Sequence, residues 1–145
     1  MADEFPGPVD FVLIEFPDDT STDATGRALS DLIDGGIVRL YDIALISKKS
    51  DGAVDRLDVA DSTTGAASGF SAFAGAQSGL CSSDDIADAG DAIDAGTTAV
   101  MLAYENAWAS PFVTSAHGAG GQMIASERIP AQALVDALEA AEAAD

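Results

Sequence analysis

The sequence is poor in basic residues, with 6 Lys plus Arg against 25 Asp plus Glu and a formal net charge of −19. Nucleic acids and anionic membrane surfaces both present phosphates, so a negative field of this size repels them. We therefore expect no nucleic-acid partner. The same field attracts cations and basic proteins, which leaves a basic protein as one kind of partner. Solubility, in a cell whose proteins are generally acidic, is the simplest reason for the acidity.

Cysteine and histidine each occur once, as Cys81 and His117. A single cysteine excludes an intramolecular disulfide, and a zinc site needs further His or Cys ligands. His117 lies near the end of a predicted short helix, where we expect a capping or surface role. The glycine-rich run 118–121 follows a helix, whereas a phosphate-binding loop precedes one. We predict no catalytic triad, no metal and no cofactor.

Long apolar runs are also missing, since no run approaches the ~20 residues that span a bilayer. The N-terminus lacks the basic residues that open a secretory signal. We therefore expect no membrane span and a cytoplasmic location. The chain has 145 residues, of which 48% are hydrophobic. That length suits one domain with a sizeable core, which we place at residues 9–145 after a loose leader at 1–8.

Strand-like segments recur along the chain. Three near-continuous apolar runs, rich in β-branched or aromatic residues, indicate strands covered on both faces: Val9–Phe16, Ile37–Lys48 and Thr97–Tyr104. Residues 53–60 alternate in polarity and predict a sheet-edge strand that forms a hairpin with the second run. Residues 122–127 predict a last strand.

Helices are predicted between these strands. One begins at Thr22 or Asp23 and ends before Gly35-Gly36, a second spans residues 84–94, and a short third begins at Ser110-Pro111. A final helix spans residues 130–142. Its side chains expected to face inward are Leu134, Val135, Leu138 and Ala141.

Two strand–helix–Gly-Gly–strand units organise the chain, with their double glycines at 35–36 and 120–121. A strand–helix–strand crossover within one sheet is almost always right-handed and parallel. Together with the hairpin, these units predict an α/β (α+β) fold. The specific prediction is a ferredoxin-like βαββαβ sandwich with a mixed sheet, extended by an extra strand and a C-terminal helix.

Four segments carry a family resemblance: GPVDFVLIEFP at 7–17, LIDGGIVRLYDIALISKKSDG at 32–52, AYENAWASPF at 103–112 and ASERIPA at 125–131. Through them, the chain resembles an uncharacterised family of small, acidic bacterial proteins, mainly actinobacterial, known as a domain of unknown function. The resemblance extends from about residue 7 to the C-terminus. It implies a ferredoxin-like fold and no particular activity.

The strongest candidate for a ligand site is Glu105-Asn106 with Trp108, directly after a buried strand. Ligands of open α/β sheets usually bind at the carboxyl ends of strands. Glu105 could act as a base and Asn106 as a hydrogen-bond donor. Alternatively, Trp108 anchors the turn and the polar pair caps the next helix. Glu15 lies at the corresponding end of the first strand, and two close carboxylates would form an acid–base pair or a cation site.

Residues 61–83 form an insert rich in Gly, Ala and Ser, which we predict to be a loop with one or two weak helical turns. Phe70 and Phe73 could dock on another subunit or fold back over their own sheet. Three aspartates at helical spacing (Asp84, Asp88 and Asp91) indicate a solvated helix face, because Ca²⁺ needs a cage of 6–8 oxygens.

These features lead to two hypotheses of function. The first is a non-enzymatic structural or interaction protein that self-associates as a homo-oligomer. It depends on the absence of a catalytic constellation, on the edge strand and on the insert. The alternative is a small-molecule-binding or enzymatic domain that uses Glu15, Glu105 and Asn106.

Overall fold

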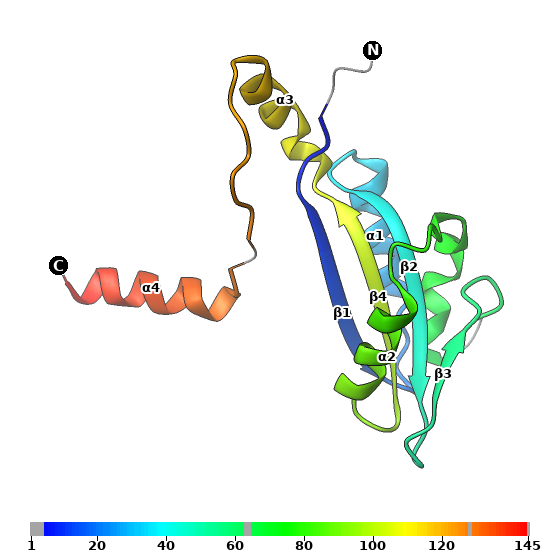
Figure 1. The fold of residues 1–145 in the computed structure, drawn as a ribbon. Helices are drawn as coiled ribbons and strands as arrows, with labels where there is room; N and C mark the ends of the chain where they lie inside the picture. Colours follow the sequence, from blue (N-terminus) through cyan, green and yellow to red (C-terminus); the bar gives the residue numbers. More distant parts are fainter. Residues whose placement is uncertain (1–4, 63–64, 128, 145) are drawn as a thin grey trace.

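The computed structural model describes residues 5–62, 65–127 and 129–144. A sheet flanked by helices forms the body, and a C-terminal segment extends away from it (Figure 1). The elements are β1 (Val9–Pro17), α1 (Asp23–Asp34), β2 (Arg39–Lys48), β3 (Val54–Leu57), η1 (Gly65–Ala76), α2 (Ser83–Ala92), β4 (Thr97–Glu105), η2 (Ala107–Ala109), α3 (Ser110–Gly118) and α4 (Ala131–Ala143).

The four strands lie in the order β1-β4-β2-β3, and every neighbouring pair is antiparallel. The α+β class is confirmed, whereas the predicted mixed sheet is wrong. β1 and β2 run in the same direction, as a crossover through α1 requires, but β4 lies between them. The chain order βαββαβ is present. The strand order does not confirm a ferredoxin-like arrangement, because that sheet centres on its first and third strands and this one centres on β4 and β2.

The two faces of the sheet carry separate apolar cores, which explains why β2 and β4 read as continuous apolar runs. On one face α2 packs over a cluster that includes Met101, Cys81 and Ile93. On the other face, α1 and η1 cover a second cluster that includes Ile43, Leu45 and Phe70.

The insert is more ordered than a loop, because η1 runs over residues 65–76 and packs against α1. Backbone meets backbone here: a Cβ on Gly26 would lie 2.0 Å from the carbonyl oxygen of Gly69, and one on Gly69 equally close to that of Thr22. The buried Thr22 hydroxyl accepts a hydrogen bond from the Gly69 N–H and donates one to the Ala66 carbonyl. Glycine therefore lets the insert close over the sheet.

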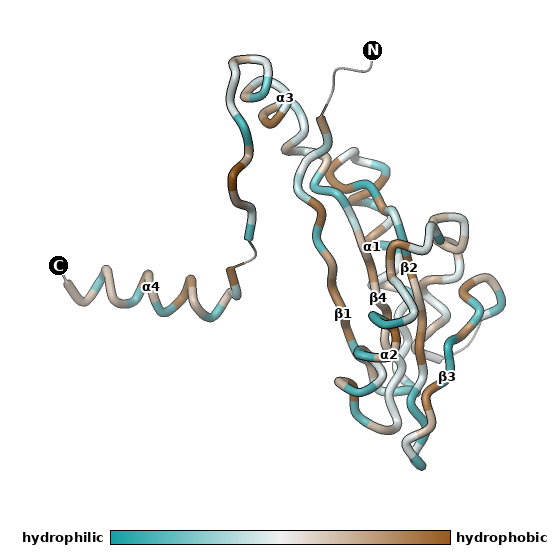
Figure 2. Tube along the Cα trace, viewed as in Figure 1, coloured by the Kyte–Doolittle hydropathy of each residue, from teal (hydrophilic) through white to brown (hydrophobic). Residues whose placement is uncertain are grey.

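We call residues 119–127 together with 129–143 the C-terminal arm. The strand predicted at 122–127 is wrong, because these residues are exposed and do not belong to the sheet. α4 forms where a helix was predicted, yet no residue in it is buried. Leu134 and Leu138 are each 56% exposed, so the expectation that they face inward is also wrong. Figure 2 shows α4 standing apart from the sheet.

Candidate functional site

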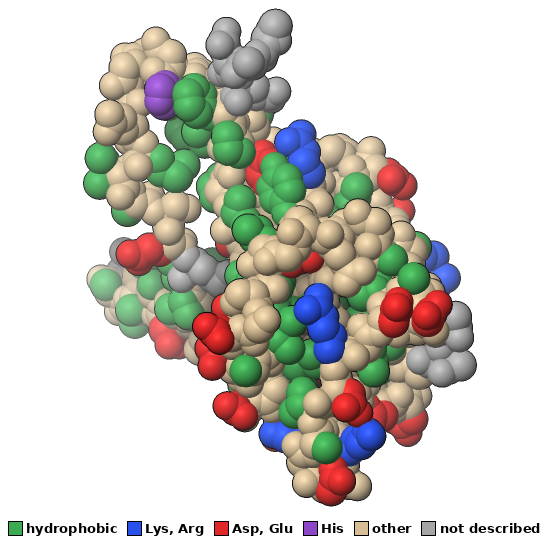
Figure 3. Space-filling view, turned by 45° about the vertical axis from the view of Figure 1, so that its right-hand side comes forward, with side chains coloured by type: hydrophobic (Ala, Val, Ile, Leu, Met, Phe, Trp, Pro, Cys, Tyr) green, Lys and Arg blue, Asp and Glu red, His purple; other side chains and the backbone are tan. Residues whose placement is uncertain are grey.

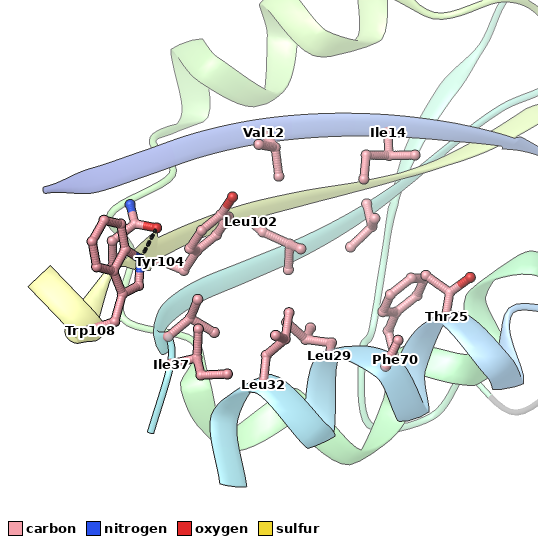
Figure 4. A pocket seen from close by; sticks show the side chains of 14 residues that line it. Val12, Ile14, Thr25, Leu29, Leu32, Ile37, Phe70, Leu102, Tyr104 and Trp108 are labelled. Carbon is pink, nitrogen blue, oxygen red and sulfur yellow. Dashed lines mark hydrogen bonds between the residues drawn. The ribbon is translucent and has the colours of Figure 1, made fainter. Parts of the chain in front are cut away.

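An apolar groove runs between β1 and α1. Alternation along β1 directs Val12 and Ile14 to the face of the sheet that α1 covers. β1 is the outer strand on this side of the sheet. Leu29 and Leu32 of α1 approach from the opposite wall, and Trp108 closes one end (Figure 4). The groove is thus formed where the helix layer stops short of the edge of the sheet.

The groove has a volume of about 440 Å³ and a mostly apolar lining. Several of its side chains remain partly in solvent, including Ile14 at 42% and Leu32 at 40% exposed. We call it the β1–α1 groove. Its lining residues are Val12, Ile14, Thr25, Ala28, Leu29, Leu32, Ile37, Val38, Phe70, Val100, Leu102, Tyr104, Asn106 and Trp108.

Polar groups gather at the Trp108 end of the groove. The Asn106 side chain donates to the Pro8 carbonyl (3.0 Å) and to the Asp10 carboxylate (3.1 Å). Its oxygen accepts from Trp108 Nε1 at 3.4 Å. The indole is 65% exposed. The predicted pair Asn106 and Trp108 is therefore brought together, and a ligand or partner in the groove would reach both.

Glu105 has a different position, because its side chain is 1% exposed and lies on the opposite face of the sheet from Tyr104. Its carboxylate accepts from the Gly7 N–H at 2.9 Å, the Tyr41 hydroxyl at 2.6 Å and the Arg39 guanidinium at 3.3 Å. These bonds hold the N-terminal segment and β2 to the end of β4. Burial raises the pKa of Glu105, but Tyr41, Gly7 and Arg39 outweigh it, and the pKa lies below its usual value.

Such a carboxylate is fully engaged and ionised at neutral pH, which suits a structural anchor better than a general base. Residues 1–4 of the predicted loose leader lie outside the described residues. Residues 5–8 are held, since Gly7 is buried against β4 and Phe5 N–H donates to the Thr114 hydroxyl.

Glu15 is not brought near Glu105. In the register of β1 with β4, Glu15 lies opposite Ala99, whereas Glu105 lies opposite Val9. Six residues of strand separate the two positions, or about 20 Å. Glu15 instead accepts hydrogen bonds from the Asp94 N–H and the Thr97 hydroxyl, which shapes the turn before β4. The antiparallel sheet therefore rules out an acid–base pair of these two glutamates.

Phe70 is 1% exposed and belongs to the core beneath α1, with Phe73 packed against the same cluster. Of the two arrangements considered for this insert, the structure has the phenylalanines folded over their own sheet. His117 lies in the last turn of α3, and its ring stacks on Phe5 with centroids 3.9 Å apart. Asp84, Asp88 and Asp91 are exposed on α2, as predicted for a solvated face.

Sequence reasoning missed Asp42, which is fully buried in β2. Its carboxylate accepts from the N–H groups of Ile43 (2.9 Å), Ser78 (3.1 Å) and Cys81 (2.6 Å). It thereby ties the loop before α2 to the sheet. A charged residue inside an apolar strand run is the signal that could have revealed it, because a buried aspartate must be paired.

Cys81 lies beside this carboxylate and is 3% exposed. Burial, together with the charge and hydrogen bond of Asp42, raises the pKa of the thiol to about 12. It is therefore a poor nucleophile. Among residues 5–62, 65–127 and 129–144, no group of three or more His, Cys, Asp or Glu side chains is placed to hold a metal ion. In the same residues, no helix has the length and apolar character to cross a membrane.

Comparison with known proteins places the chain in one family. The model of a family of unknown function (DUF6325) matches residues 5–144, nearly the whole chain, so the protein belongs to that family. The expected membership of a family without assigned function is thereby confirmed. No curated protein and no solved structure matches the sequence.

Proposed function

We propose that this member of the DUF6325 family is a non-enzymatic structural or interaction protein that acts as a homo-oligomer. The observation that carries the proposal is α4, a 13-residue helix with no buried residue. Isolated helices of this length are marginally stable in water and normally depend on an apolar face packed against a partner. Leu134, Val135 and Leu138 form such a face and lie 43–56% exposed.

The distribution of exposed apolar side chains supports the same proposal. They concentrate on the N-terminal segment, β1, α3 and the arm, and Figure 3 shows hydrophobic side chains grouped on the arm and α4. Apolar patches of this kind mark interaction surfaces on soluble proteins. The residues are Phe5, Val9, Phe11, Ile14, Phe112, Met123, Ile124, Ile129, Leu134, Val135 and Leu138.

β1 adds a second favourable feature, because it is a nine-residue edge strand. Natural edge strands are usually protected by lysine, proline, a bulge or covering structure. β1 carries two charged residues, Asp10 and Glu15, and one proline at its last position, but no lysine, and its apolar side chains Phe11 and Ile14 are partly exposed on opposite faces. Among the described strands, β1 has a hydrogen-bonded neighbour on one side only, β4, which favours association of its other side with another polypeptide.

Sedimentation equilibrium of the full chain tests the proposal. We expect a mass of at least twice the 14.6 kDa of one chain at micromolar concentrations. Leu138→Glu should shift the protein towards the monomer, because a charge would have to be buried. Ala140→Glu is the matched control, since position 140 points away from position 138 on the helix and should leave the mass unchanged. A monomer at every concentration and salt refutes self-association.

The effect of salt on binding distinguishes self-association from binding to a basic protein, which the charge of −19 also permits. Two acidic chains repel, so self-association strengthens as salt screens their charges. Binding to a basic protein weakens under the same change. A cytoplasmic location is part of the proposal and is checked by cell fractionation.

A second candidate function is the binding of a small apolar molecule. The groove volume of about 440 Å³ falls within the range of ligand pockets, and Asn106 supplies a polar group at one end. Of the residues first considered for this role, only Asn106 and Trp108 line the groove. Titration of fatty acids and other apolar metabolites while monitoring Trp108 fluorescence tests this function. A groove variant, Ile14→Glu, should abolish the response.

A further inference from the structure

We propose that α4 of one copy occupies the β1–α1 groove of a second copy, so that two chains exchange their C-terminal arms. This inference rests on the proposed self-association and names its surface. It joins two unpartnered features, an amphipathic helix without a buried residue and an apolar groove with exposed walls.

The helix α4 is short enough to lie along β1, which forms one wall of the groove. Thirteen helical residues extend about 20 Å, and the nine residues of β1 extend about 30 Å. Leu134 and Leu138 lie one turn apart on α4 and match a groove whose walls are formed by Ile14 and Leu32. The polar face of α4 would stay in water, where Gln132 already donates a hydrogen bond to Asp136 (2.9 Å).

The path of the arm would carry α4 past the edge of β1 towards a second copy. Ser126 and Glu127 line a shallow hollow together with Pro8, Val9 and Phe11, so the arm passes the beginning of β1 before α4 starts. In Figure 1, α4 then points away from its own body. Two copies that face each other through their β1 edges would each send α4 towards the other's groove. Such a reciprocal contact is isologous and closes at two copies.

The same stretch of the arm explains a failed prediction. Residues 122–127 have the composition of a strand, but strands are stable only when their backbone groups find a partner. In the described part of the chain, no strand lies beyond β1 in the position that a fifth strand would take. In the exchanged dimer the arm would lie along that edge, and α4 would cover the adjacent groove. The partner would thus supply the extra strand and helix that the sequence predicts.

A second copy, rather than the same chain, is favoured because the single chain leaves α4 unburied although its own groove is open. The charges on α4 also bear on how two copies could bind each other. α4 carries Asp136, Glu139 and Glu142 and no basic residue. Two copies therefore approach against charge repulsion, and the apolar contact must supply the attraction.

Cysteine cross-linking between two variants tests the exchange. Ile14→Cys places a thiol in the groove and Leu138→Cys places one on α4. The native Cys81 is buried and will not compete. Mixed in equal amounts and oxidised, the two variants should give a covalent dimer on a non-reducing gel. Ala140→Cys mixed with Ile14→Cys is the matched control and should give little dimer, because position 140 lies on the opposite side of the helix.

Other outcomes overturn the inference. If the mixture gives no dimer, α4 does not enter a partner's groove. The same conclusion follows if a double variant, with Ile14→Cys and Leu138→Cys in one chain, only cross-links within itself. Sedimentation of charge variants separates this failure from failure of self-association. Ile14→Glu and Leu138→Glu should each weaken dimerisation by about tenfold or more. A wild-type dimer that loses its mass with Leu138→Glu but not with Ile14→Glu overturns the groove assignment alone.

Mixing the two charge variants gives an independent measure. In a reciprocal exchange, a chain with an intact groove and a chain with an intact α4 form one complete contact, so the mixture should recover part of the dimer. Leu80→Glu is the control, because Leu80 is 57% exposed in the loop before α2. It should leave the dimer unchanged. No recovery on mixing contradicts the exchange.

Discussion

Replacing Glu105 with glutamine should destabilise the fold by about 2–3 kcal/mol. The carboxylate is 1% exposed and accepts from Gly7, Tyr41 and Arg39. Hydrogen bonds to a charged group contribute about 1.5–3 kcal/mol each. Glutamine keeps one acceptor oxygen, but its amide turns a donor towards another donor. Since 1 kcal/mol moves the melting temperature of a domain near this size by about 2–4 °C, we expect a decrease of about 5–10 °C.

Differential scanning calorimetry measures this change, with Glu139→Gln as the matched control. Glu139 lies on the exposed α4, so the same chemical change there should shift the melting temperature by less than about 1 °C. Tyr41→Phe removes one donor to Glu105 and should cost about 1–1.5 kcal/mol. The two changes act on one hydrogen bond, so the double variant should lose less than the sum.

The pH dependence of stability tests whether the ionised Glu105 carboxylate stabilises the fold. The pKa of Glu105 is lower in the folded protein than its ordinary value of 4.5. Its contribution is therefore complete above the unfolded pKa and is lost as the pH falls through the folded pKa. The gap in melting temperature between wild type and Glu105→Gln should be largest at neutral pH and shrink as the pH falls below 4.5 and through the folded pKa. An unchanged melting temperature at neutral pH, or a gap that does not vary with pH, refutes the anchor role.

Further predictions concern the buried polar and glycine contacts. Asp42→Ala leaves three N–H groups without this acceptor, the buried ones of Ile43 and Cys81 and the partly buried one of Ser78, and should cost about 3–5 kcal/mol in urea unfolding. The Cys81 thiol, with its pKa raised to about 12, should react with a disulfide reagent much more slowly in the native protein than in urea. Gly26→Ala or Gly69→Ala would place a Cβ 2.0 Å from a backbone oxygen and should lower the yield of folded protein or separate η1 from α1, seen by limited proteolysis.

The strands and α-helices of the body could be predicted from the sequence because each is defined by local periodicity, whereas η1 was expected only as a loop with weak helical turns. β2 and β4 are apolar without interruption since both faces of the sheet are covered, and α2 begins at a capping box in which Ser82 and Asp85 bond each other's backbone. The order of the strands in the sheet, in contrast, does not depend on local periodicity. Nothing local in β4 specifies that it lies between β1 and β2. Neither the strand order nor the antiparallel pairing could therefore be predicted from the sequence.

At the candidate site, too, the local sequence indicated some features and the tertiary packing decided the others. The end of β4 drew attention to Glu105, Asn106 and Trp108 because polar groups follow a buried strand. The neighbouring side chains then decided their roles: Asn106 and Trp108 line the groove, whereas Glu105 points to the other face and is enclosed. Pairing Glu15 with Glu105 failed because it assumed parallel strands. The groove itself depends on where α1 lies over the sheet, and no local pattern defines that.

The net charge of −19 limits the kind of contact that the exposed apolar face of α4 can make. A charge of −19 keeps copies apart at low salt and opposes indiscriminate aggregation of the β1 edge. A contact that overcomes this repulsion must bury a well-matched apolar area, because its electrostatic term is unfavourable. The stripe of Leu134, Val135 and Leu138 is the described surface best suited to supply that area. Specificity would then come from the fit of one helix to one groove, with the surface charge suppressing other contacts.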